Sequence, residues 1–375
     1  MKVTIQRQGL LTALQRVQGV VEKRNTMPIL ANILLEAKED GLDILATDLE
    51  LAMRGLYNAK VDQPGAVTFS ARKLFEILKE IREPEIQITV SDNSWVTIKA
   101  GRSEFRVVGL PSQDFPSLPA IERDGLIPLP SSGLLELIRH TIFAVGDNDT
   151  RYVLNGVLVS ITSGPAQKAT IRLVGTDGHR LALAEEEVSI EPGSLPDNET
   201  KVIIPKKAAV EIRRLLEEDD NEPLVGFTKN MVIFRKSGLV LTSRVMEGAY
   251  PNYQQVVPKE GSKKIKVSKD DFEGAIRRVS LLSKDKSYAI KLAFTKDRIH
   301  LSSSNPDLGE ANEEIAAQHT GDDFSTGFNA RYLLDVLSAI DGEFLTLQME
   351  TPLSPCLIQE HENPKFKAVV MPVKV

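Results

Sequence analysis

Two residues that could perform acid–base chemistry lie close together in the segment LVGTDGHRLAL, residues 173–183. Asp177 and His179 are separated by one glycine, and Arg180 follows directly. A carboxylate and an imidazole at this spacing could transfer protons in hydrolysis, provided that a nucleophile or a metal ion is held near them. The segment is therefore a candidate catalytic loop, and its interpretation depends on the elements that position it.

The same segment takes part in an internal repeat. Its strand-like part, IRLVGTD, aligns with LDILATD and IHLSSSN elsewhere in the chain. The last residues of the three fragments, Asp48, Asp177 and Asn305, lie 129 and 128 residues apart (177 − 48 and 305 − 177). The positions after Asp48 and Asn305 offer no histidine. We expect the Gly-His-Arg turn in only one of three copies, which argues against catalysis and for a role that the repeat itself does not require.

Each copy also contains two segments with apolar residues at helical spacing, such as Leu10 and Leu14 in the first copy. The second segments predict helices over residues 70–81, 205–216 and 329–340. Short strand-like leads, VTI, LIPL and IKV, precede the first helices, and alternating strands follow the second ones. The pattern predicts an α+β protein with three copies of one domain, in which helices cover one face of mostly antiparallel sheets.

Segments rich in proline and turn formers separate the copies. PSQDFPSLPA, residues 111–120, ends the first copy, and YPNYQQVVPKEGSKK, residues 250–264, ends the second. The predicted domains are residues 1–123, 124–259 and 260–375.

The composition is that of a globular protein, with 42% hydrophobic residues. No stretch approaches the roughly 18 consecutive apolar residues of a membrane helix, and the N-terminus lacks the apolar core and cleavage site of a signal peptide. Cys356 is the only cysteine, which excludes an internal disulfide and fits a reducing compartment. We therefore expect a cytoplasmic protein.

Charges of the two signs are distributed unevenly, although acidic residues outnumber basic ones by 52 to 46. Acidic residues gather in loops and strand ends such as LEEDDNE, residues 216–222, whereas Lys and Arg recur on helix faces that point away from the predicted core. In a single copy this would be an ordinary solvated face, but recurrence in three copies suits a ligand contacted through regularly spaced phosphates. The candidate residues for contact with such a ligand, on or beside these helices, are Arg72, Lys73, Lys206, Lys207, Arg277 and Lys284.

Sequence motifs for metal, nucleotide or cofactor binding are absent. The five histidines are scattered, with none at HxxxH spacing, and Tyr152 stands where a calcium loop starting at Asp147 needs glycine. There is no Walker A stretch and no GxGxxG. We expect no metal ion, no cofactor, no catalytic residue and no enzymatic activity.

Seven fragments, in order along the whole chain, carry a family resemblance. They are MKVTI, TMPILANILLEA, TDLELAMR, NDTRYVLNGVLV, TDGHRLA, GAYPNYQQVVP and the terminal VVMPVKV. Together with the threefold repeat, they resemble the bacterial beta sliding clamps, the beta subunits of DNA polymerase III.

The resemblance implies three clamp domains per chain, with helices lining the interior of a ring and antiparallel sheets outside. It implies a homodimer joined head to tail around double-stranded DNA of any sequence, with no membrane partner. The implied function is that of a processivity factor, which tethers the replicative polymerase, the clamp loader, and repair and translesion polymerases through short linear motifs.

The resemblance further implies a hydrophobic pocket for motifs rich in Gln, Leu and Phe, built from the TDGHR turn and the C-terminal strand. Alternate apolar residues would lie on one face of that strand, and its proline favours an exposed or edge position. Gln255 stands where arginine is expected, so motif preference would differ in detail. The implied pocket residues are Leu154, Thr176, Gly178, His179, Arg180, Leu181, Pro251, Val256, Val369, Met371, Pro372 and Val373.

Two further sets of residues follow from the same resemblance. Arg24, Arg151 and Tyr152 join the candidate DNA contacts. At the dimer interface, the basic strand GRSEFRVV would face an acidic segment, with Phe and Leu between them, although Glu104 replaces an expected basic residue. The implied interface residues are Arg102, Phe105, Arg106, Leu281, Leu282, Glu310, Glu313 and Glu314.

Two other classes of function are alternatives to a clamp. A hydrolase would bind its substrate as a monomer, whereas a clamp would be a dimer. A repeat-built scaffold that never touches nucleic acid would explain the three domains but not the recurrent basic helices. Oligomeric state and retention on DNA therefore distinguish the three hypotheses.

Overall fold

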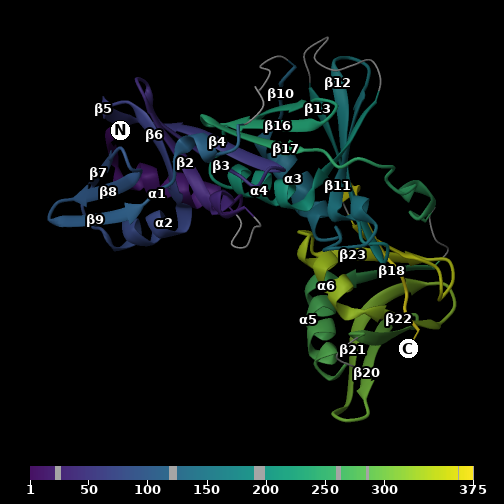
Figure 1. Cartoon of the computed structure of the whole chain (residues 1–375). Coiled ribbons are helices and arrows are strands. Elements are labelled where there is room, and N and C mark those ends of the chain that lie inside the picture. The colour runs from purple at the N-terminus through teal and green to yellow at the C-terminus, as the bar shows by residue number, and fades with distance from the viewer. Residues whose placement is uncertain are drawn as a thin grey trace. The chain divides into compact units, whose positions relative to one another are not determined.

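The computed structural model describes residues 1–21, 27–117, 125–189, 199–258, 263–283, 287–361 and 363–374. Helices and antiparallel strands alternate along the chain, which confirms the predicted α+β class (Figure 1). In these ranges, no helix combines the length and the apolar character that crossing a membrane requires.

The chain divides into two compact units, each made of two segments. Unit 1 comprises residues 1–132 and 210–245, and unit 2 comprises residues 133–209 and 246–375. Because this division differs from the three predicted domains, their boundaries stay a prediction.

Among the described residues, two α-helices lie wholly in unit 1, α1 (Arg7–Val17) and α2 (Ala71–Glu80), and they pack against each other. Leu10 and Leu14 of α1 are fully buried, so the predicted apolar face is confirmed. The side chain of Ser70 caps α2 by accepting a hydrogen bond from the backbone N of Lys73 (3.2 Å). A five-stranded sheet has the order β5 (Ala59–Gln63), β1 (Lys2–Gln6), β7 (Glu85–Val90), β8 (Trp95–Ala100) and β9 (Ser103–Val108).

A second sheet in unit 1 joins strands that are far apart in sequence. The pairing of β17 with β4 runs from Leu239 opposite Gly55 to Ser243 opposite Leu51, and so connects the first and second predicted domains. The strand order is β10 (Ile127–Pro128), β15 (Leu224–Phe227), β16 (Met231–Lys236), β17 (Leu239–Arg244), β4 (Leu51–Tyr57), β3 (Gly41–Thr47), β2 (Asn32–Lys38) and β6 (Gly65–Ser70).

Unit 2 has one twelve-stranded sheet. Its pairing of β13 with β25, from Arg180 opposite Val370 to Ala184 opposite Phe366, connects the second and third predicted domains. The strand order is β14 (Thr200–Pro205), β11 (Gly156–Ser163), β12 (Lys168–Thr176), β13 (Arg180–Ser189), β25 (Asn363–Val370), β24 (Cys356–Glu360), β23 (Phe344–Met349), β18 (Lys263–Ser268), β21 (Gly309–Thr320), β20 (Arg298–Asn305), β19 (Ala289–Phe294) and β22 (Phe324–Asn329).

Of the remaining helices, α4 agrees with the predicted range 205–216 to within one residue and α6 with its predicted range to within two. Helix α6 was predicted over 329–340, and α5 and α6 pack against each other. The bounds are α3 (Ser131–Ile142), α4 (Lys206–Leu216), α5 (Lys269–Val279) and α6 (Ala330–Ser338).

A buried lysine of unit 1 satisfies the end of α4. The side chain of Lys236, on β16, is only 2% exposed. Its Nζ donates hydrogen bonds to the carbonyl oxygens of Leu215 (2.9 Å), Leu216 (3.2 Å) and Asp219 (2.5 Å). The last carbonyls of a helix have no partner within the helix, so a cation here replaces water as their donor.

We predict that the substitution Lys236→Met lowers the free energy of unfolding by about 2–3 kcal/mol, because buried carbonyls lose their donor. Urea denaturation followed by circular dichroism measures the change. Lys229, exposed in the turn before β16, provides the control Lys229→Met, which should leave the urea midpoint unchanged. Equal midpoints for the two variants would contradict the capping role.

Candidate functional site

The candidate catalytic loop forms the turn between β12 and β13. Asp177 accepts hydrogen bonds through Oδ1 from the backbone N of His179 (2.9 Å) and of Arg180 (3.0 Å). The Thr176 hydroxyl donates to the carbonyl oxygen of Arg180 (2.6 Å) and accepts from the backbone N of Gly178 (3.1 Å). Gly178 has a φ of +83°, in the left-handed region that favours glycine. The Asp177 carboxylate therefore holds the turn together.

An equivalent turn exists in the first copy, so the prediction that only the middle copy has one is wrong. Asp48 accepts hydrogen bonds from the backbone N of Glu50 (2.9 Å) and of Leu51 (2.6 Å). In the third copy, Asn305 accepts one from the backbone N of Asp307 (2.9 Å). These bonds use the Asp or Asn side chain and backbone groups, so they do not require the Gly-His-Arg sequence.

Arg180 attaches the turn to helix α6. Its side chain is only 11% exposed, and the guanidinium pairs with Asp177 (3.1 Å) and with Asp335 of α6. It also lies over the ring of Tyr332, 4.6 Å from the centroid, and 5.7 Å from that of Phe143. Burial raises the pKa of Tyr332. With two carboxylates and two rings around it, Arg180 is a fixed wall of this region.

The C-terminal tail crosses from one strand to another beside the same turn. The backbone N of Met371 donates to the carbonyl oxygen of His179 (2.9 Å), and that of Val373 donates to Gly327 in β22 (2.8 Å). The predicted alternation of apolar residues along a single strand is therefore wrong beyond the end of β25. Pro372, which has no N–H to donate, lies between these two hydrogen bonds. His179 itself is exposed, with its ring stacked on that of Tyr332 at 6.2 Å between centroids.

The predicted pocket residues differ in exposure. Leu154, Leu181 and Val369 are buried, and the last two belong to one apolar cluster. Pro251 and Val256 are exposed, whereas the tail from 371 to 373 is half-buried. The structure thus brings the turn and the tail together beside this cluster. Sequence reasoning missed three partly buried residues that pack against it, although all lie next to quoted motif residues: Val153, Tyr250 and Val257.

Comparison with known proteins identifies the family. Models of the N-terminal, central and C-terminal domains of the DNA polymerase III beta subunit match residues 1–119, 128–252 and 254–374. The chain belongs to the beta sliding clamp family. The predicted family and clamp fold are confirmed.

Relatives of this clamp match over the full length of both chains. The beta sliding clamp of Caulobacter vibrioides is 39% identical over 377 residues, which cover 100% of each chain. Crystal structures of the DNA polymerase III subunit beta from Pseudomonas aeruginosa (34% identity, TM-score 0.92) and of a griselimycin-bound sliding clamp from Bartonella birtlesii (35%, 0.93) also cover 100% of each chain. The protein is a processivity clamp, a non-enzymatic class of protein.

Arg151, a candidate DNA contact of this clamp, is bound to the TDGHR turn. Its guanidinium pairs with Asp149 (2.9 Å) and donates to the carbonyl oxygen of Asp177 (2.9 Å). The Arg151 hydrogen bonds hold the pKa of the Asp149 carboxyl at about 2. Tyr152, the next residue, is 56% exposed.

Two candidate contacts lie at the start of α2 and one on α5, all exposed but paired with neighbouring acids. Arg72 and Lys73 both bind Glu76, at 2.8 and 2.6 Å. Arg277 binds Glu273 at 2.5 Å. Each cation therefore reaches solvent with part of its charge already neutralised.

The remaining candidates lie at the start of α4 or outside the described residues. Lys206 donates to Asp147 (2.8 Å) and to the carbonyl oxygen of Val145 (3.0 Å). Lys207 is half-buried. Arg24 and Lys284 lie outside the described residues.

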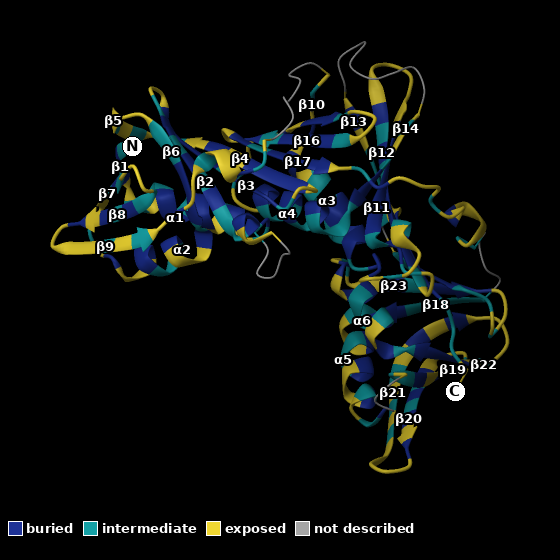
Figure 2. Cartoon of the chain, viewed as in Figure 1, coloured by how far each residue is buried: buried dark blue, intermediate teal, exposed yellow. Residues whose placement is uncertain are grey.

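The strand predicted to form one side of the dimer interface is β9, at the edge of the five-stranded sheet and largely exposed (Figure 2). Arg102 and Arg106 are exposed, and Phe105 is half-buried. Glu104, the unexpected acid, pairs with Lys99 on the adjacent strand (3.0 Å). Its charge is thus matched within the chain, which leaves the two arginines to dominate this edge.

The apolar part of the other predicted side is a short 3-10 helix, η5 (Ser280–Leu282), which packs against β21. Leu281 is 78% exposed and Leu282 is half-buried. A single exposed leucine is common on protein surfaces, so this exposure by itself does not establish an interface.

Two of the three acidic residues predicted for this side of the interface, all on β21, form ion pairs within the chain. Glu313 binds Arg278 (2.5 Å), and Glu314 binds Arg298 (2.9 Å). The side chain of the exposed Glu310 has no ion pair or hydrogen bond to another residue in the described ranges.

We predict that Arg180→Gln loosens the TDGHR turn, because two carboxylates lose a shared cation and Tyr332 loses its cation–π partner. The loss should be about 1–3 kcal/mol locally and should appear as faster amide hydrogen exchange at residues 177–181. Lys168→Gln, which breaks an exposed pair with Glu187 on the same hairpin, is the control and should leave exchange at the turn unchanged. Equal exchange in both variants would mean that Arg180 does not fix the turn.

Proposed function

We propose that two copies of this clamp close head to tail into a ring around double-stranded DNA. We further propose that the TDGHR turn and the C-terminal tail receive short peptide motifs of the proteins that the clamp tethers. The observation that supports the ring is the strand pairing between repeats within one chain.

Equivalent strands pair wherever two copies adjoin within one unit. β4 follows the turn at Asp48 and pairs with β17, and β13 follows the turn at Asp177 and pairs with β25. β21 follows the third turn, at Asn305, but its residues 309–316 pair only with β20 among the described strands. β9, the last strand of the first copy, has one open side. A third junction of the same kind therefore requires β9 of a second chain.

The side chains at these two edges complement each other. Arg102 and Arg106 accompany β9, and Glu310 lies on the open part of β21. Phe105 and Leu281 supply apolar surface between the charged groups. Interfaces typically place apolar residues at the centre and matched charges at the rim. Repeating such a head-to-tail contact twice closes a two-chain ring.

The proposed contacts with DNA are weak and independent of sequence. Arg72, Lys73 and Arg277 already share carboxylates of their own helices, so a phosphate must compete with those acids. Contacts of this kind exchange easily, and a clamp that slides needs contacts that it can release. Sliding along DNA and location in the cytoplasm are parts of the same proposal.

The proposed peptide site rests on the fixed turn and the tethered tail. Arg151 and Arg180 hold the turn from two sides, while two backbone hydrogen bonds hold the tail. Met371 is half-buried and flexible, which suits motifs of different sequence. The replicative polymerase, the clamp loader, and repair and translesion polymerases are the proposed partners.

We predict that replacing Leu281 and Leu282 with Asp converts the dimer into a monomer of the 41.4 kDa chain mass, because charged groups would be buried in the interface. Sedimentation velocity measures the mass. The same variant should not remain on nicked circular DNA, whereas the unaltered protein should remain until the circle is linearised.

Leu353 provides a matched control, since it is 76% exposed and lies outside the proposed interface. Leu353→Asp should leave both the dimer and retention on DNA intact. A Leu281/Leu282 variant that sediments as a dimer would refute the proposed interface.

We predict that deleting residues 371–375 abolishes binding of a peptide rich in Gln, Leu and Phe, because the tail and its contact with His179 are removed. Isothermal titration calorimetry measures the binding. Removing only residues 374–375 leaves both described hydrogen bonds of the tail in place and should have little effect. Undiminished binding after the longer deletion would place the peptide site elsewhere.

A further inference from the structure

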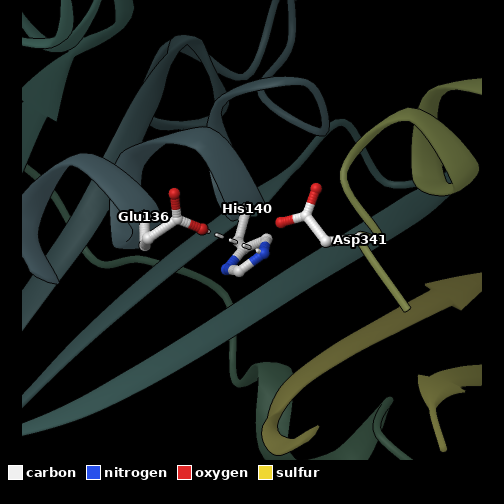
Figure 3. A group of neighbouring side chains, drawn as sticks. All are labelled: Glu136, His140 and Asp341. Carbon is white, nitrogen blue, oxygen red and sulfur yellow. Dashed lines mark ion pairs between the residues drawn. The ribbon is translucent and has the colours of Figure 1, made fainter. Parts of the chain in front are cut away.

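A group of potential metal ligands lies on and beside helix α3, and none of its members belongs to the proposed peptide, DNA or dimer sites. Glu136 and His140 are four residues apart on α3 and therefore face the same side of the helix. Asp341, just after α6, completes the group. One ligand atom from each residue lies within 4.8 Å of the others, and Figure 3 shows the imidazole between the two carboxylates.

The histidine of this group is buried without a partner for one nitrogen. His140 is 7% exposed, and its ring stacks on Phe366 with 4.6 Å between centroids. Within the described part of the chain, its buried Nε2 has no hydrogen-bond partner. An imidazole nitrogen that is buried and unpaired beside two carboxylates needs an explanation, and a bound cation would supply one.

A guanidinium now neutralises the two carboxylates. Arg139 donates to Glu136 (2.7 Å) and to Asp341 (3.0 Å), and these bonds raise the pKa of Arg139. Glu360 adds a further negative charge that acts on His140. Lys269 also acts on Asp341, so the group has two neighbouring cations, of which Arg139 binds both carboxylates directly. The side chain of Arg139 is one-third exposed, which gives it a path into solvent.

We propose that Glu136, His140 and Asp341 bind a divalent transition-metal cation of the zinc class, in exchange for the guanidinium of Arg139. One imidazole nitrogen and two carboxylate oxygens are ligands that zinc accepts, and they leave a fourth position for water. Magnesium and calcium prefer oxygen ligands alone. This inference does not depend on the proposed ring or peptide site.

The distances fit such an ion with small movements. Nε2 of His140 lies 3.7 Å from Oε2 of Glu136. Zinc at its usual bond lengths in a tetrahedral site separates two ligand atoms by roughly 3.4 Å. Asp341 is exposed at the end of a helix, so its side chain can make the larger adjustment.

Calorimetric titration of the full chain without an affinity tag, with zinc chloride in a non-chelating buffer, tests the proposal. We expect one zinc ion per chain, measurable at about 10 µM protein, and no comparable binding of magnesium. His140→Gln and Asp341→Asn should each weaken binding by more than about tenfold, because each removes a ligand. Arg139→Gln should tighten it by about tenfold or more, because it removes the competing cation.

His300 provides a matched control, because its Nδ1 also lies 3.7 Å from a glutamate, Glu314, but its side chain is 40% exposed. His300→Gln should bind zinc like the unaltered protein. Circular dichroism checks that each variant is folded. If His140→Gln does not fold, Asp341→Asn, which changes an exposed residue, tests the site in its place. The proposal is overturned if the unaltered chain binds no zinc, if Asp341→Asn binds as tightly as the unaltered chain, or if Arg139→Gln binds no more tightly.

Discussion

Backbone hydrogen bonding between adjacent copies of the repeat is the interaction on which this fold depends. Five residue pairs join β4 to β17, and five join β13 to β25. Each pairing extends a sheet through the boundary between two predicted domains. The compact units therefore do not coincide with the repeats, because each unit forms around a sheet that two copies share.

The Asp or Asn turn of each copy determines where the pairing strand begins. Asp48 accepts a hydrogen bond from the first residue of β4, and Asp177 accepts one from the first residue of β13. Asn305 accepts one from the turn before β21. In the middle copy, Arg180 also connects this turn to α6. The Asp-Gly-His-Arg pattern, which resembles a catalytic loop, is thus a structural turn. In the middle copy alone, its arginine also connects the turn to α6.

Local features were predictable from the sequence, and long-range ones were not. Helical periodicity located α2 and α6 to within two residues. Periodicity contains no information on which distant strand will pair with β13. The tail at Met371 illustrates the difference, because its course beyond β25 depends on an acceptor in β22.

Side-chain partners were equally inaccessible to sequence reasoning. The sequence suggests unpaired positive charge on the helix faces around Lys73 and Arg277. In the structure, acids one helical turn away bind both side chains. Spacing between histidines alone does not reveal Glu136, which lies four residues before His140. Asp341 is about 200 residues further along the chain, and only the fold brings it close.

The two open edges, β9 and β21, also limit how separate chains can associate. An unpaired strand edge can hydrogen-bond to any other edge, including its own copy on another molecule. Two β9 edges would bring Arg102 and Arg106 against the same arginines, and two β21 edges would bring Glu310 near another Glu310. Like charges on facing strands destabilise pairing. The charges at these edges thus disfavour aggregation of like edges while both strands are still exposed.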